Sequence, residues 1–191
     1  MKRLLSQHPA AEAALGAELD RELKVSPPAV ADLPRLPYAG AVVRESLRLY
    51  PPAWIMTRGA LEECEIGGYH VPSGAMLMAP QWAMHRDPRY YQDPLAFVPE
   101  RWLHGLADRL PRFAYFPFGG GPRQCIGYQF AMMETVLVLA TIAQRFRLRL
   151  TSTTPVVPRP AITLRPEGPV RMLVSDVPAN QDNKKAGPPS A

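Results

Sequence analysis

The chain has 191 residues, a hydrophobic content of 47% and a formal net charge of +5. This length allows one domain with a real core, and the composition is ordinary for a globular protein. The cations are scattered and do not alternate with aromatic residues, so we expect no nucleic-acid partner. No apolar run approaches the roughly 18 residues of a membrane span, and no signal-peptide core follows the first residues. We therefore expect a cytoplasmic protein that does not associate with a membrane.

The first part of the chain is predicted to be helical. Apolar residues recur on one side from Pro9 to Leu23, which is typical of an amphipathic helix. A proline-bearing connection from Lys24 to Arg35 follows. A second helix is expected from Tyr38 to about Tyr50, because the residue before Pro51 avoids the α region.

The middle of the chain is predicted to consist of short strands and an irregular connection. Glycine- and proline-containing turns separate the strand-like segments, which are Ile55 to Ala60, Glu63 to Val71 and Ala75 to Ala79. Cys64 lies in the second of them, where we assign it no role. A helical turn is expected from Gln81 to His85, before a meander that extends to Pro99.

The C-terminal part combines one long helix with strands. A helical pattern runs from Tyr128 to Arg145, and the alternation from Phe146 to Leu150 indicates a strand. Ala161 to Leu164 and Val170 to Val174 are predicted to pair as a hairpin. Residues 177–191 are polar, charged and proline-containing, which is typical of a disordered tail.

Cys125 lies in the most informative segment, Phe118-Gly-Gly-Gly121-Pro-Arg123-Gln-Cys125-Ile-Gly127. An isolated cysteine is most often small, buried and inert. This one follows a glycine-rich loop and an arginine, and it precedes the long helix. Such a setting can hold a thiolate and offer it to a metal. An apolar loop, a flanking cation and a single thiolate suit haem iron in particular.

Glu45 and Arg48 share one face of the second predicted helix, because they are spaced i, i+3. A pair of this kind is most often a surface ion pair of small energetic value. Further along the chain, the segment Pro99-Glu100-Arg101-Trp102 offers another arginine.

The sequence resembles the cytochromes P450 in these segments. The segment around Cys125 matches that family's pattern Phe-x-x-Gly-x-Arg-x-Cys-x-Gly at every fixed position. The pair Glu45 and Arg48 matches the pattern Glu-x-x-Arg. Pro99 to Trp102 is similar to Pro-Glu-Arg-Phe, with tryptophan in place of the usual phenylalanine. The segments follow the family's order, and the resemblance runs from about Met1 to Val174.

The resemblance implies a fold and a cofactor. The fold class is α+β, mainly α, with residues 1–176 forming the haem-proximal, C-terminal half of the P450 fold. The cofactor is haem b, with Cys125 as ligand to the iron. Other residues implied to contact the haem or to shape the loop around it are Arg123, Phe118, Gly121, Gly127 and Arg58. The two arginines would pair with propionates, and the phenylalanine would keep water from the sulfur.

The resemblance also implies roles outside the cysteine loop. Glu45, Arg48 and Arg101 are expected to form a buried ionic triad with a structural role beneath the haem. Removing one member would leave a buried charge unpaired. The segment expected to line the substrate pocket is apolar and consists of Ala53, Trp54, Ile55 and Met56.

The implied activity is that of a bacterial, soluble-type haem-thiolate monooxygenase, which inserts one oxygen atom of O₂ into a small apolar organic substrate. A ferredoxin or a flavoprotein reductase is the implied electron donor. No segment resembles the family's distal, oxygen-activating helix, so we expect a fragment with little activity alone. The alternative is a non-catalytic haem-binding or partner-binding remnant that pairs with a separately encoded N-terminal piece.

Overall fold

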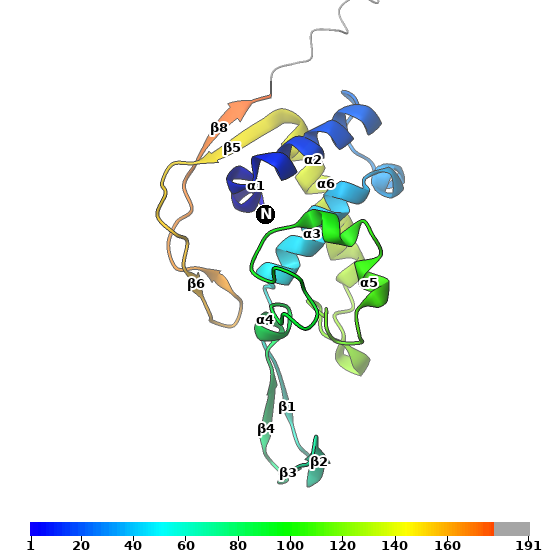
Figure 1. Ribbon diagram of the computed structural model, residues 1–191, viewed down its shortest axis with the longest axis vertical. Coiled ribbons are helices and arrows are strands. Elements are labelled where there is room, and N and C mark those ends of the chain that lie inside the picture. The colour runs from blue at the N-terminus through cyan, green and yellow to red at the C-terminus, as the bar shows by residue number, and fades with distance from the viewer. Residues whose placement is uncertain (178–191) are drawn as a thin grey trace, which may run out of the picture.

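The computed structural model describes residues 1–177, and its longer helices pack around one core (Figure 1). The helices are α1 (Lys2–Gln7), α2 (Pro9–Glu22), α3 (Pro37–Leu49) and α6 (Tyr128–Arg145). α2 packs against both α3 and α6, and α1 packs against α2. The most deeply buried apolar side chains of this core include Leu5, Leu15, Leu19, Val42, Val43, Leu139 and Ala140.

The bounds of α3 follow from local chemistry. Pro37 occupies the first turn, where its fixed φ suits a helix and its missing N–H costs nothing. The helix ends at Leu49, because Tyr50 precedes a proline. The buried carboxylate of Glu18 in α2 accepts the N–H groups of Tyr38 and Ala39 at 2.7 and 2.8 Å. One helix thus caps the next.

Short antiparallel strands extend away from the helices at the lower end of Figure 1. β1 (Met56–Gly59) pairs with β4 (Met76–Ala79), and β2 (Cys64–Ile66) pairs with β3 (Tyr69–Val71). The first and last predicted strands are confirmed as β1 and β4, and the middle segment is divided at Gly67 and Gly68 into β2 and β3. Most side chains of these strands are exposed. The helical turn predicted before the meander is confirmed as α4 (Gln81–Met84).

The C-terminal strands pair differently from the prediction. β5 (Phe146–Leu150) pairs antiparallel with β8 (Met172–Asp176), and β6 (Pro158–Arg159) pairs with β7 (Arg165–Pro166). The predicted hairpin of residues 161–164 with residues 170–174 is therefore wrong. The physical reason is that residues 161–164 bond elsewhere: the Leu164 N–H donates to the Pro52 carbonyl at 2.9 Å.

Irregular segments link these elements. The predicted connection after α2 contains a 3₁₀ helix, η1 (Val30–Arg35). The meander includes η2 (Pro99–Trp102) and α5 (Leu106–Arg109), and the cysteine loop includes η3 (Gly121–Arg123). This mixture of dominant helix and small sheets confirms the predicted α+β, mainly α class.

Two predictions concern the ends and the surface of the chain. Within residues 1–177, no helix has both the length and the apolar character needed to cross a bilayer. The tail predicted for residues 177–191 lies, from residue 178 onward, outside the described residues.

Candidate functional site

The three charged side chains of the predicted triad are in contact. Arg48 donates to the Glu45 carboxylate through Nε at 2.9 Å and through Nη2 at 2.8 Å. Arg101 Nε donates to the same carboxylate at 3.1 Å. Both Glu45 and Arg48 are fully buried, so this is not a surface ion pair. A buried pair of this kind needs further hydrogen bonds to offset its desolvation.

Backbone groups and one indole supply those hydrogen bonds. Trp102 Nε1 donates to Glu45 Oε2 at 2.8 Å, and the Val98 N–H donates to Oε1 at 3.0 Å. Arg48 in turn donates to backbone carbonyls of the meander, which belong to His85, Pro94 and Ala96, at 2.7–2.9 Å. Trp102 stands where the family pattern has phenylalanine, and its N–H is an extra donor to the triad. The signal was available, because a buried indole N–H requires an acceptor.

The cysteine loop is a tight backbone turn that places Cys125 just before α6. Gly119 and Gly121 have φ values of +75° and +72°, which disfavour side chains other than glycine. The Cys125 N–H donates to the Phe118 carbonyl at 2.9 Å, which closes the loop. Gly127 is the residue before the first turn of α6. The sulfur therefore lies near the start of an 18-residue helix, whose first N–H groups carry a partial positive charge.

Packing limits the size of side chains in the same loop. A Cβ on Gly120 would lie 2.3 Å from Cε1 of Phe113, and one on Gly119 would lie 3.0 Å from the sulfur of Met56. The Phe118 ring packs at 5.6 Å from the Tyr128 ring. The loop is thus held against both the segment that follows α5 and the first residue of β1.

The chemistry of the donor set fits a haem iron. Cys125 is exposed, and its neighbours Ile126 and Phe130 are 105% and 62% exposed, so a lone thiol lies on an open apolar face. Within residues 1–177, no group of three or more His, Cys, Asp or Glu side chains could hold a bare metal ion. A metal at this thiol must therefore bring its other ligands, as an iron porphyrin does.

The two arginines expected at the propionates are exposed. Arg58 lies on β1 and donates only to the neighbouring Thr57 carbonyl, at 2.8 Å. Arg123 lies in η3 beside the cysteine. Neither guanidinium pairs with a carboxylate among the described residues, so both remain available for an anionic ligand.

The apolar segment from Ala53 to Met56 lies beside the cysteine loop, through the approach of Met56 to Gly119. Its Trp54 indole donates to the Ala161 carbonyl at 2.7 Å, although the two residues are 107 positions apart. The adjacent Ile162 is 101% exposed. The sequence reasoning gave residues 161–164 no place at this site, because no local pattern signals a contact over that separation.

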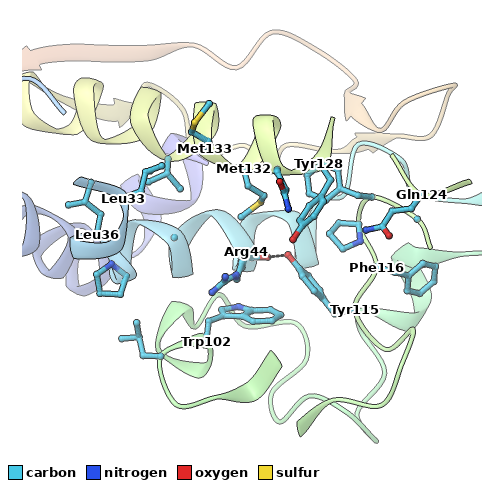
Figure 2. A pocket seen from close by; sticks show the side chains of 18 residues that line it. Leu33, Leu36, Arg44, Trp102, Tyr115, Phe116, Gln124, Tyr128, Met132 and Met133 are labelled. Carbon is cyan, nitrogen blue, oxygen red and sulfur yellow. Dashed lines mark hydrogen bonds between the residues drawn. The ribbon is translucent and has the colours of Figure 1, made fainter. Parts of the chain in front are cut away.

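A cavity of about 680 Å³ opens between α3, η2 and the start of α6, next to the cysteine loop. Figure 2 shows the side chains of Arg44, Trp102, Tyr115 and Tyr128 around it. The Tyr115 hydroxyl donates to the Arg44 carbonyl at 3.1 Å, and burial raises the pKa of that hydroxyl. The Arg44 side chain itself is exposed, which leaves a cation at the wall of an otherwise largely apolar hollow.

Comparisons with known proteins agree with this geometry. The cytochrome P450 family profile matches residues 3–174. The chain is 45% identical over 170 residues to cyclooctatin synthase of Streptomyces melanosporofaciens, a match that covers 89% of this chain and 37% of the relative. It is 46% identical over 146 residues to cyclooctat-9-en-7-ol 5-monooxygenase of the same organism, covering 76% of this chain and 32% of the relative.

A third relative is pentalenene oxygenase of Streptomyces avermitilis, 39% identical over 145 residues, with 76% of this chain and 32% of the relative covered. The chain thus spans about a third of the length of these curated relatives. Proteins of the matched family use haem b. With a profile match that extends over almost all of the described residues, the chain belongs to the cytochrome P450 family.

Proposed function

We propose that this chain provides the thiolate-ligand part of a haem monooxygenase, in which Cys125 would bind the iron. The observation that carries the proposal is the position of the Cys125 thiol. It lies on an open apolar face at the start of α6, in a loop whose residues match the family pattern. A single soft sulfur ligand without other metal-binding side chains suits a porphyrin-bound iron.

The residues around the sulfur have complementary tasks in this proposal. When bound, haem b supplies the O₂ and redox chemistry from which one oxygen atom is transferred. Cys125 would bind the iron from its place before α6, whose start carries a partial positive charge. Arg123 and Arg58 would bind the propionates as charge-assisted donors. Phe118 packs beside the loop and limits the access of water to the sulfur.

The proposed substrate is a small, apolar organic molecule. The segment Ala53 to Met56 and the exposed Ile162 present apolar side chains at one side of the cysteine loop. Two relatives are named for the oxygenation of pentalenene and of cyclooctat-9-en-7-ol, names that denote an unsaturated hydrocarbon and an unsaturated alcohol. Both the lining and these names favour a substrate rich in hydrocarbon.

The proposed electron donor is an acidic protein, either a ferredoxin or a flavoprotein reductase. The chain carries a net charge of +5, and the exposed cation of Arg44 lies at the cavity next to the cysteine loop. Opposite charges speed and orient association between proteins. An acidic partner that docks at this cavity would approach the loop that holds the sulfur.

We expect the 191 residues alone to bind haem but to turn over substrate slowly. Cys125, Ile126 and Phe130 face solvent, so the described residues do not enclose the face on which the haem would lie. Oxygen transfer from haem depends on a pocket that excludes water. The same open face supports the second candidate, a haem-binding chain that is completed by another polypeptide.

The proposed ligand can be tested with a matched pair of cysteine variants. Cys64 and Cys125 are both exposed and both free. We expect haem to bind the wild-type chain and the Cys64→Ala variant with the absorbance band of a thiolate-ligated ferrous carbonyl complex. The Cys125→Ala variant should lose that band.

An unchanged spectrum in Cys125→Ala would refute the proposal. Addition of an electron donor and an apolar substrate then distinguishes the two candidates. Product formation by the chain alone indicates the enzyme, and haem binding without product indicates the haem-binding chain.

A further inference from the structure

His85 is a fully buried histidine that directly follows α4, and its side chain has no role in the site described above. Its ring packs against Tyr115 and Phe116, with centroid distances of 5.2 and 5.4 Å. Its Nε2 lies 2.9 Å from the backbone nitrogen of Phe116. A backbone N–H can only donate, so Nε2 is the acceptor and the proton of a neutral ring resides on Nδ1.

Burial keeps this imidazole neutral. The pKa of His85 is lowered from its usual 6.5 to about 4, chiefly by desolvation, with the nearby cations Arg48 and Arg86 acting in the same direction. At neutral pH the Nε2 lone pair is therefore available to accept the Phe116 N–H throughout.

The other end of the same residue is bonded to the ionic triad. Arg48 Nη1 donates to the His85 carbonyl at 2.7 Å, and Arg48 is itself held by Glu45. On the loop side, the Phe116 carbonyl accepts the Gly119 N–H at 2.9 Å. A continuous series of hydrogen bonds thus connects the buried triad to the glycine turn before the cysteine.

We propose that His85 is a positioning residue, whose imidazole fixes the start of the cysteine loop to the buried triad and so sets where the Cys125 sulfur meets the haem iron. This inference rests on the proposed function, since it assigns His85 to the same ligand loop. The residue does not contact the iron; it acts through Phe116 and Gly119.

A purely structural role predicts a different pattern of mutational effects. If His85 only filled space, His85→Phe would be tolerated, because the ring would be kept. If the hydrogen bond to Nε2 is what matters, His85→Phe should disturb the loop, because it leaves the buried Phe116 N–H without a partner. His85→Gln keeps an acceptor at a similar reach and should rescue the loop.

The first readout uses the chain without haem. In His85→Phe we expect the Phe116 amide to exchange its hydrogen about tenfold faster than in wild type, because its hydrogen bond is lost. We also expect the alkylation rate of Cys125 by iodoacetamide to change severalfold, while that of Cys64, the internal reference, stays constant. His85→Gln should resemble wild type in both measurements.

The second readout uses the haem-loaded chain. His85→Phe should lower the fraction of the ferrous carbonyl complex that has thiolate ligation, and His85→Gln should retain it. Leu15→Ala in α2 is the control for lost stability, because Leu15 is a buried core residue away from the loop. That variant should unfold more easily but keep the wild-type thiolate fraction.

Specific results would overturn the inference. They are wild-type exchange and alkylation in His85→Phe, equal effects in the Gln and Phe variants, or an equal loss of thiolate ligation in Leu15→Ala. If the wild-type chain shows no thiolate ligation, the proposed function fails. The haem-free exchange and alkylation rates then still decide whether His85 positions the cysteine loop.

Discussion

At the scale of single residues, the triad shows how a tryptophan in place of the motif's usual phenylalanine is accommodated. Glu45 receives donors from Arg48, Arg101, Trp102 and the backbone of Val98. The tryptophan replaces a phenylalanine that has no hydrogen-bond donor, so it adds a bond to a fully buried carboxylate. These donors offset the desolvation that burial of the side chain costs.

His85 gives a pH dependence at the same scale. Its folded pKa is about 4 and its usual pKa is 6.5, so the folded state binds fewer protons than the unfolded state between these values. The free energy of unfolding should therefore fall as the pH falls from 6.5 to 4, and it should be unaffected by His85 above 6.5. At about 1.4 kcal/mol per pKa unit, the total loss is about 3 kcal/mol.

Urea unfolding of the wild type and of His85→Gln across this range measures the effect. Carboxylates elsewhere titrate in both proteins, so the difference between the two curves isolates His85. Parallel curves would show that His85 is not buried as a neutral ring.

At the scale of elements, α2 stabilises the start of α3. The carboxylate of Glu18 accepts two N–H groups of the first turn of α3. Burial raises the pKa of Glu18, and those two hydrogen bonds oppose the shift. Glu18→Ala should lower the free energy of unfolding by about 1–3 kcal/mol, because it leaves the first turn without its acceptors.

Glu22→Ala on the same helix is the matched control. Glu22 pairs only with the exposed Arg21 and Arg35, so its loss should cost below about 1 kcal/mol. Chemical unfolding followed by circular dichroism compares the two variants. Equal losses would mean that the cap between the helices contributes nothing.

The elements also show what the sequence can and cannot predict. Helices such as α6 were predictable because local periodicity and flanking prolines or glycines determine them. The pairing of β5 with β8 was not, because competing short strands have similar patterns and a register depends on distant contacts. The local motifs pointed to Cys125 and Glu45 as candidate site residues. The hydrogen bond from Trp54 to Ala161 had no local signal, because it joins residues 107 positions apart.

At the scale of the whole molecule, the arrangement of charge should govern association. Arg44 lines the cavity next to the cysteine loop, whereas Arg21 lies on α2 and does not line it. Arg44→Glu should weaken the binding of an acidic ferredoxin by about tenfold at low ionic strength, because a favourable charge becomes a repulsive one.

Arg21→Glu makes the same change of net charge and should have a much smaller effect. Titration of each variant with the ferredoxin, at low and at high salt, measures the dissociation constants of the two variants. The difference in affinity between the two variants should become smaller at high salt, because salt screens the interaction between the charges. Equal weakening by the two variants would indicate that only net charge matters and would remove the cavity from the proposal.

The exposure of Cys125 has a practical meaning for anyone who handles the protein. The sulfur that is proposed to bind iron is accessible to any electrophile or oxidant in the buffer, and an exposed thiol can be alkylated or oxidised. Oxygen, alkylating reagents and haem would then compete for the Cys125 sulfur. The order in which they are added would therefore decide whether a preparation binds haem and becomes coloured.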